Sequence, residues 1–130
     1  MHWIAKLAGS AVLASSADAQ AAPVAMSPAA RADLQCFVLN MIAVGSTTEE
    51  EVKEAGTVGT MYFYGKLRVE APELDLVEAV RQELVSFEGN PQADAIAQAC
   101  DFEVHQRGDD LMRFGEELMK AEGQSSPSSS

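Results

Sequence analysis

The sequence has few of the residues on which most protein chemistries depend. It contains two cysteines, two histidines and one tryptophan, and its 9 Lys and Arg stand against 20 Asp and Glu, for a net charge of −11. This excess of negative charge repels nucleic acid and anionic membrane surfaces, so neither is an expected partner. No apolar run approaches the roughly 18 residues of a membrane-spanning helix, and 130 residues suffice for a single domain. An acidic globular protein remains.

The N-terminal segment has the features of an export signal. A single charge, at Lys6, precedes a short apolar stretch that is followed by small residues. Two Ala-x-Ala patterns, at 17–19 and 19–21, fit the site that signal peptidase cuts. We therefore expect a signal peptide over residues 1–21, cleaved near Ala21, and a periplasmic or secreted protein. The alternative is an ordinary first helix, because the apolar residues of this segment also form a loose stripe.

The two cysteines, Cys36 and Cys100, both lie after the expected cleavage site. An even number of cysteines in a small exported chain is most simply explained by a disulfide. Closing a loop of about 65 residues removes roughly 4 kcal/mol of unfolded-state entropy, which is comparable to the whole stability of a small domain. We expect one Cys36–Cys100 disulfide; the alternative is two buried free thiols that pack as small apolar side chains.

Apolar residues recur along the chain at the three- and four-residue spacing of amphipathic helices. We expect an all-α fold of four to five helices in a small bundle, with the disulfide between the first and fourth helices. Residues 22–30 form a linker and the start of the first helix, residues 31–121 the helical domain, and residues 122–130 a disordered, Ser-rich tail. The number of helices depends on residues 107–109, Arg-Gly-Asp, which we expect to break or kink the fourth helix.

The segment at residues 60–65, Thr-Met-Tyr-Phe-Tyr-Gly, fits two kinds of secondary structure. Its aromatic residues suit a strand, whereas its place in a helical period suits a buried helix, which we favour. The helix containing it is expected to begin near Thr47, where two overlapping pairs, Thr47 with Glu50 and Thr48 with Glu51, have the spacing of a capping box.

Gly56, Gly59, Tyr62 and Tyr64 are candidate lining residues of a binding groove. The glycines lie on one face of the expected second helix, where small residues let another helix approach closely, and the tyrosines follow them. The alternative is that all four contribute to core packing.

Candidate catalytic groups are few and poorly spaced. His105, the one histidine left after cleavage, lies five residues from Cys100, which places the two on different faces of a helix. The carboxylate pairs at 109–110 and 116–117 are adjacent residues, which point about 100° apart on a helix and are unsuited to joint action. The phosphate-binding patterns GxxxxGK[ST] and GxGxxG are absent. We expect no catalytic residue, no metal site and no cofactor.

Several of these features together resemble a known class of proteins. A cysteine in the first helix, the TMYFYGKL segment, the Ala99–Cys100 pair and the following RGDDLMRFGEEL segment resemble small exported bacterial two-cysteine helical proteins, whose family has no established activity. The likeness covers about residues 33–120. More distantly, the two-cysteine all-helical plan is similar to that of the acid-resistance periplasmic chaperones, which loosen at low pH and hold unfolded clients on exposed apolar surface. This chain departs from them in its longer loop between the cysteines.

These observations favour a non-enzymatic binding or interaction protein of the periplasm or the exterior, whose partner is an unknown protein or a small apolar ligand. An acid-stress periplasmic chaperone is the first alternative, as the more distant resemblance implies. A small carboxylate-dependent hydrolase or lyase is the second. The sequence leaves the oligomeric state open.

Intact-mass spectrometry of the purified protein tests the export signal. Cleavage near Ala21 removes Lys6 and Asp18, so the mature chain keeps the charge of −11 while losing one histidine and its tryptophan. We expect the mass of a chain that begins at Ala22. A mass that retains residues 1–21 would contradict export by a cleaved signal peptide.

Overall fold

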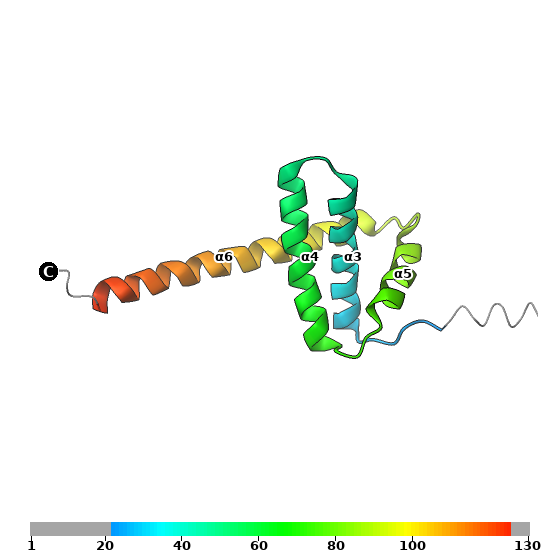
Figure 1. Ribbon diagram of the computed structural model, residues 1–130, viewed down its shortest axis with the longest axis horizontal. Helices are drawn as coiled ribbons and strands as arrows, with labels where there is room; N and C mark the ends of the chain where they lie inside the picture. The colour runs from blue at the N-terminus through cyan, green and yellow to red at the C-terminus, as the bar shows by residue number, and fades with distance from the viewer. Residues whose placement is uncertain (1–21, 126–130) are drawn as a thin grey trace, which may run out of the picture.

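The computed structural model describes residues 22–125, which form four helices and no strand (Figure 1). The helices are α3 (Pro28–Ser46), α4 (Glu50–Glu70), α5 (Leu76–Phe87) and α6 (Ala93–Ser125). The expected all-α fold is therefore confirmed, as is the disulfide, which joins the first and fourth of these helices. The expected signal peptide, residues 1–21, lies outside the described residues.

Local sequence explains where the helices begin. The Ser27 hydroxyl accepts a hydrogen bond from the Ala30 amide, and Pro28 is the first residue of α3. The Asp75 carboxylate likewise caps α5, at 3.2 Å from the Glu78 amide nitrogen. Both capping boxes expected at the start of α4 were wrong, because α4 begins at Glu50 with no side-chain cap and the Thr47 hydroxyl accepts from the Glu49 amide instead.

The core lies where α3 and α4 pack side by side as an antiparallel pair (Figure 1). Leu34 and Val38 of α3 meet Phe63 and Leu67 of α4, and all four side chains are fully buried. Phe63 belongs to the segment at residues 60–65, which is helical, as favoured from the sequence. Ala79 is the buried apolar residue through which α5 joins this core.

Two glycines let α3 and α4 approach closely. A Cβ atom at Gly56 would stand 2.7 Å from Val44 Cγ2, and one at Gly59 would overlap the Asn40 amide group. Asn40 is itself held in place, because its Nδ2 donates to the Cys36 carbonyl oxygen at 2.8 Å. The glycines are therefore part of the packing that sets the distance between the two helices.

α6 crosses the α3–α4 pair near its own N-terminal end and then extends well beyond it (Figure 1). Of the break or kink expected at residues 107–109, the break is absent, since α6 runs as one helix through Gly108. One interior glycine costs a helix only about 1 kcal/mol. Asp110 spans this point by pairing with Arg107 at 3.2 Å and with Arg113 at 2.9 Å. Residues 122–125, expected in the disordered tail, are also helical, and residues 126–130 lie outside the described range.

Within residues 22–125, none of the helices is both long enough and apolar enough to cross a membrane. α6 reaches 33 residues, but charged residues recur along its whole length.

Substituting the two kinds of glycine in α4 tests the close packing of the helices. Gly59→Ala places a Cβ against the Asn40 amide and should lower the free energy of unfolding by about 1 to 3 kcal/mol. Gly65→Ala is the matched control, because its Cβ meets nothing within 4 Å and alanine favours a helix by up to about 1 kcal/mol. Urea denaturation of both variants measures the difference. Equal stabilities would contradict the packing role of Gly59.

Candidate functional site

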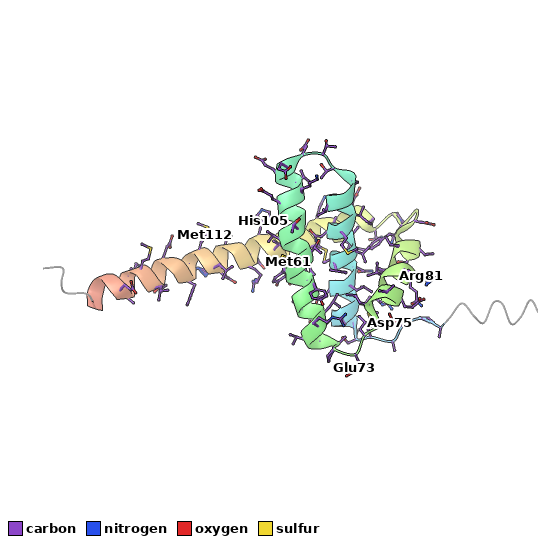
Figure 2. All side chains as sticks on the ribbon, viewed as in Figure 1. Met61, Glu73, Asp75, Arg81, His105 and Met112 are labelled. Atoms are coloured by element: carbon purple, nitrogen blue, oxygen red, sulfur yellow. A yellow bond between two sulfur atoms is a disulfide. The ribbon has the colours of Figure 1, made fainter. Side chains whose placement is uncertain are left out.

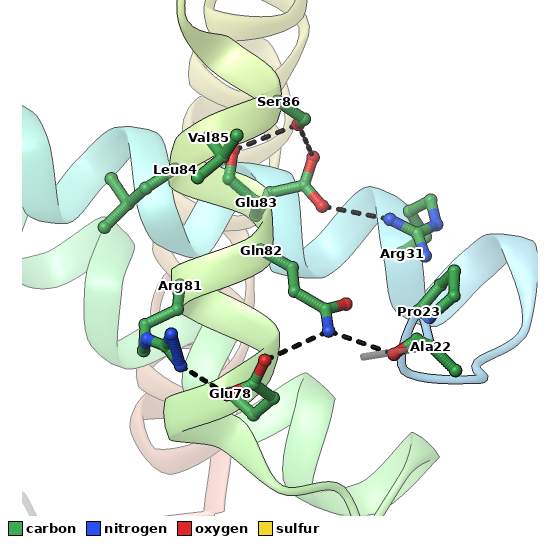
Figure 3. Close-up of a pocket in the computed structure, with 10 residues that line it drawn as sticks. All are labelled: Ala22, Pro23, Arg31, Glu78, Arg81, Gln82, Glu83, Leu84, Val85 and Ser86. Carbon is green, nitrogen blue, oxygen red and sulfur yellow. Dashed lines mark hydrogen bonds and ion pairs between the residues drawn. The ribbon is translucent and has the colours of Figure 1, made fainter. Parts of the chain in front are cut away.

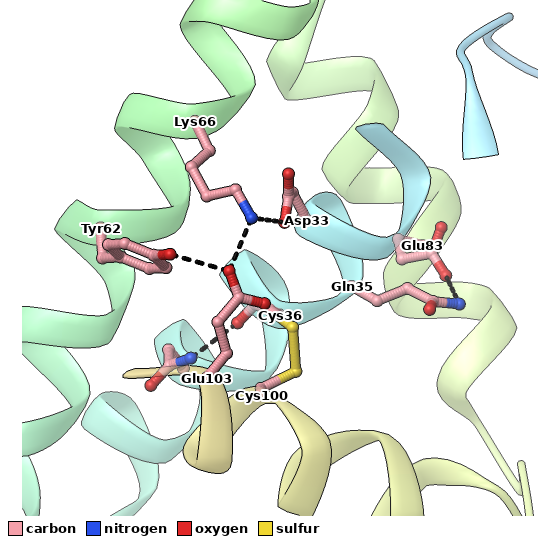
Figure 4. The surroundings of a disulfide bond; sticks show 9 residues. Asp33, Gln35, Cys36, Tyr62, Lys66, Glu83, Cys100 and Glu103 are labelled. Atoms are coloured by element: carbon pink, nitrogen blue, oxygen red, sulfur yellow. Dashed lines mark hydrogen bonds and ion pairs between the residues drawn. A yellow bond between two sulfur atoms is a disulfide. The ribbon is translucent and has the colours of Figure 1, made fainter. Parts of the chain in front are cut away.

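The disulfide sits where α6 crosses α3, and both cysteines are buried (Figure 4). Cys36 and Cys100 are joined by an S–S bond of 2.07 Å with their Cα atoms 5.5 Å apart. This is the pairing expected from the sequence. It fixes the N-terminal third of α6 covalently to the centre of the helical core.

A hydrogen-bonded polar cluster holds α6 a short distance further along (Figure 4). Glu103 of α6 accepts hydrogen bonds from Lys66 Nζ at 2.6 Å and from the Tyr62 hydroxyl at 2.8 Å, both from α4. Lys66 Nζ also lies 3.0 Å from Asp33 Oδ1 of α3. One lysine therefore joins three helices.

The cluster shifts the ionisation of its members. Burial alone would raise the pKa of the Glu103 carboxyl, but hydrogen bonds from Lys66 and Tyr62 outweigh it and hold that pKa below its ordinary value. Burial alone would likewise lower the pKa of Lys66, but its hydrogen bonds to Glu103 and Asp33 outweigh burial and raise the pKa. The cluster therefore favours the charged forms of both partners.

The buried carboxylate of Asp33 is the second ionisable feature of this region. Its side chain is nearly fully buried, and among the described residues its Oδ2 atom has no hydrogen-bond partner. Hydrogen bonding to Asp33, followed by burial and repulsion, raises the pKa of the nearby Glu70 carboxyl. A proton on Glu70 would let that carboxyl donate to Asp33, which accounts for the direction of the shift.

Two hollows lie elsewhere on the surface of the described residues. The larger, of about 880 Å³, runs between the chain entering α3 and one face of α5 (Figure 3). Its charged groups pair with each other, Arg81 with Glu78 at 2.6 Å and Arg31 with Glu83 at 3.0 Å. The smaller hollow, of about 250 Å³, lies between α3 and α6. The charged side chains that line the larger hollow therefore neutralise one another by forming ion pairs.

The four candidate groove residues are not gathered around a hollow. Gly56 and Gly59 are buried under α3, in the packing described above. Tyr62 is half-buried and donates to Glu103. Tyr64 is exposed at the surface of α4, with its ring centroid 6.0 Å from that of Phe37. The groove interpretation is therefore wrong for the glycines, which serve helix packing.

The residues considered for catalysis lie on the exposed part of α6. His105 Nδ1 stands 2.9 Å from the Asp101 carbonyl oxygen of the same helix. The carboxylate pairs at 109–110 and 116–117 are exposed and line neither hollow. Residues 22–125 contain no group of three side chains placed to hold a metal ion.

The projecting half of α6 is the feature that the sequence analysis did not identify as a site. From residue 105 to residue 123 every residue is exposed apart from the half-exposed Gly115, and Figure 2 shows Met112 well clear of the other helices. Five large apolar side chains are more than half exposed there: Leu111, Met112, Phe114, Leu118 and Met119. In proteins most of the stability of a helix comes from packing of its apolar face, and in the described residues these five side chains stay largely open to solvent.

A seven-residue repeat explains how these side chains are arranged. Residues 108–114, GDDLMRF, are matched by residues 115–121, GEELMKA: glycine, two acids, leucine, methionine, a base and an apolar residue. Residues seven apart lie within about 20° of each other on a helix. The repeat therefore builds one face, the Leu–Met face, from Gly108, Leu111, Met112, Gly115, Leu118 and Met119.

The Leu–Met face continues the side of α6 that packs in the core. Val104 lies seven residues before Leu111, and Cys100 and Val104 both contact the buried cluster. The signal for this face in the sequence is the seven-residue repeat itself. The same apolar side of one helix is thus covered near its start and open along its second half.

Comparison of the chain with protein-family models, with curated proteins and with solved structures finds no match. The resemblance to exported two-cysteine helical proteins, and the more distant one to acid-resistance chaperones, stay hypotheses. Function is therefore inferred from the geometry of α6 and of the residues that hold it.

Removing the charge of Glu103 should change how the free energy of unfolding decreases at acid pH. Because the folded-state pKa of Glu103 is lowered, its contribution to stability is present above the unfolded-state pKa of about 4.3 and is lost as the pH falls through the folded-state value. Glu70, whose pKa is raised, acts in the opposite direction and makes this decrease shallower in the wild type. Glu103→Gln should therefore flatten the decline of the unfolding free energy between about pH 5 and pH 2.

Urea denaturation at a series of pH values measures this effect. The exposed Glu51→Gln in the first turn of α4 is the control for loss of one negative charge. If the free energy of unfolding of Glu103→Gln decreased at acid pH as that of the wild type does, the stabilising role of Glu103 would be contradicted.

Loss of the disulfide should lower the free energy of unfolding more than loss of any one polar contact. Replacing both cysteines by serine frees a loop of about 65 residues in the unfolded chain, and we expect a decrease of about 4 kcal/mol in the free energy of unfolding. Denaturation of this variant beside oxidised wild type gives the value. A decrease under about 1 kcal/mol would show that the polar cluster, rather than the disulfide, holds α6.

Proposed function

We propose that the protein is an exported, non-enzymatic interaction protein in which the core of α3, α4 and α5 carries α6, and the projecting half of α6 is the recognition element. The observation that carries this proposal is the Leu–Met face. Its four large apolar side chains, with Phe114 at its edge, are 52–75% exposed on a helix that extends away from its own core.

The energetics favour a bound state for this helix. Burying a large apolar side chain contributes about 1.5 to 3 kcal/mol, and five such side chains lie together on the projecting half of α6. An amphipathic helix that lays its apolar face against a partner is a common mode of recognition, with anchors spaced three, four and seven residues apart. Leu111, Phe114 and Leu118 have this spacing.

Export is supported by two observations on different parts of the chain. The buried disulfide is typical of proteins from oxidising compartments. The N-terminal sequence has the pattern of a cleaved signal peptide. Together they favour a periplasmic or secreted protein.

Acid-triggered chaperoning is the second candidate, and the Glu103 cluster is what favours it. Protonation of Glu103 weakens its bonds to Lys66 and Tyr62, which hold α6 on α4, while the disulfide still ties α6 to α3. The side of α6 that packs on the core would then open next to the Leu–Met face. A client-aggregation assay at pH 2 to 3 tests this candidate: no suppression at stoichiometric ratios would remove it.

The hydrolase or lyase alternative gains no support from the site. The carboxylates at 109–110 and 116–117 lie on an exposed helix and line neither of the two hollows. A small apolar ligand is also a poorer fit than a protein, because the Leu–Met face lies on a convex helix whereas ligand sites are concave.

Site-specific photo-crosslinking in the producing cell tests the recognition element. A photoreactive phenylalanine analogue replaces Phe114 in the full-length chain, and the control places it at Val77 of α5, which is 73% exposed against 64% for Phe114. We expect a discrete adduct from position 114 and none from position 77. Absence of any adduct at 114, or the same adducts from both positions, would contradict a recognition role for α6.

A further inference from the structure

We infer that Met112 and Met119 form a paired oxidation site, at which hydrogen peroxide reversibly turns the apolar Leu–Met face into a partly polar one. This inference rests on the proposed function and adds to it a means of regulation. It follows from the exposure of the two thioethers, from the glycines that precede them and from the repeat that places both.

The two methionines present the sulfur that an oxidant in solution can reach. Met112 is 68% exposed and Met119 is 75% exposed, on the part of α6 that lies clear of the other described helices. Both cysteines of the chain are joined in the disulfide and are buried. A peroxide molecule must touch the sulfur atom that it oxidises, so these thioethers are open to it and the cysteines are not.

A glycine lies four residues before each of the two methionines. In a helix a long side chain leans toward the N-terminus, over the residues three and four positions earlier. The residue four positions earlier is Gly108 for Met112 and Gly115 for Met119. A Cβ atom at either glycine would meet nothing within 4 Å. The space beneath each thioether is therefore open, and the repeat creates this opening twice.

Met61 of α4 separates the effect of the glycines from that of exposure. It is 68% exposed, as Met112 is. The residues three and four positions before it are Val58 and Thr57, which both carry side chains. Exposure alone predicts that Met61 and Met112 react at the same rate, whereas an opening over a glycine predicts that Met112 reacts faster.

The reaction transfers one oxygen atom and two electrons. The sulfur attacks one oxygen atom of hydrogen peroxide with a lone pair, the O–O bond breaks, and a sulfoxide and a molecule of water form. Sulfur is oxidised and peroxide is reduced. Methionine sulfoxide reductases reverse the change: two thiols supply two electrons and two protons, the sulfoxide oxygen leaves as water, and the thiols become a disulfide.

Oxidation at both positions would change the Leu–Met face along its whole length. Each heptad contributes one leucine and one methionine to the face, so half of its large apolar side chains would become polar. A partner that packs on the face would then bury sulfoxide oxygens that lack a hydrogen-bond donor, which disfavours binding. The glycines, which weaken a helix, gain a role in this account because they keep the sulfur atoms accessible.

Peptide-mapping mass spectrometry after brief peroxide treatment of the purified, disulfide-bonded protein tests the site. We expect sulfoxide to form at Met112 and Met119 at least about threefold faster than at Met61, because no side chain lies beneath them. Met41, which is 38% exposed, should react more slowly than all three. A rate at Met61 equal to or above that at Met112 would overturn the inference.

Filling the space beneath the thioethers should protect them. Gly108→Gln with Gly115→Gln should slow sulfoxide formation at both methionines severalfold, while the melting temperature rises because glutamine favours a helix over glycine. Gly123→Gln is the matched control: Gly123 is equally open but follows Met119, on the side from which the thioether leans away. Unchanged rates in the double variant would contradict the role of the glycines.

Crosslinking from position 114 measures the effect of oxidation on recognition. Cells that carry the photoreactive analogue there are treated with hydrogen peroxide before illumination, and we expect the adduct to decrease at least about fivefold, since a sulfoxide is polar. In Met112→Leu with Met119→Leu, which keeps side-chain size and apolar character, the adduct should be unchanged. An equal decrease in both proteins would contradict regulation through these two methionines.

The outcomes separate this inference from the proposed function. If the adduct from position 114 persists after mass spectrometry shows both sulfoxides, α6 stays the recognition element and regulation by oxidation is wrong. If untreated cells give no adduct, the recognition role is wrong and the regulation of it is wrong as well. The oxidation rates decide separately whether Met112 and Met119 are the preferred sites.

Discussion

The placement of α6 depends on the Cys36–Cys100 disulfide more than on any other single interaction. The antiparallel pair of α3 and α4 has its own buried core in Leu34, Val38, Phe63 and Leu67. α6 has no comparable core contact, and it meets that pair through a short N-terminal stretch. The disulfide fixes this crossing point, and the bonds of Glu103 to Lys66 and Tyr62 fix the direction in which the helix leaves the core. What lies beyond residue 105 is positioned by these two attachments.

The fold was predictable from the sequence to the extent that local rules decide it. Helical periodicity gave the all-α class, Ser27 and Pro28 marked the start of α3, and the even cysteine count indicated the disulfide. The break expected near Gly108 was wrong because one glycine costs a helix little, and Asp110 bonds on both sides of it. A helix-breaking residue such as glycine therefore predicts the end of a helix only where no side-chain bonds connect the residues on its two sides.

The candidate site was harder to predict, for two physical reasons. Apolar residues at helical spacing have the same pattern whether their face is buried or open, so Leu111 and Leu118 fitted one more core-facing helix. Small residues are equally ambiguous, since Gly56 and Gly59 turned out to face α3, whereas Gly115 faces solvent. The polar cluster was also hidden, because Asp33, Lys66 and Glu103 come from three helices that are far apart in the sequence. Only their arrangement in space distinguishes these cases.

The projecting helix also affects how large a binding partner the protein can accommodate. A pocket admits only a molecule small enough to enter it, and a face near the core would oblige a large partner to fit around the core. The stretch of α6 beyond residue 105 extends for about 30 Å at 1.5 Å per residue, and none of α3, α4 and α5 flanks it (Figure 1). If this stretch is the recognition element, it can reach a segment on a bulky or surface-anchored assembly while the acidic core stays at a distance.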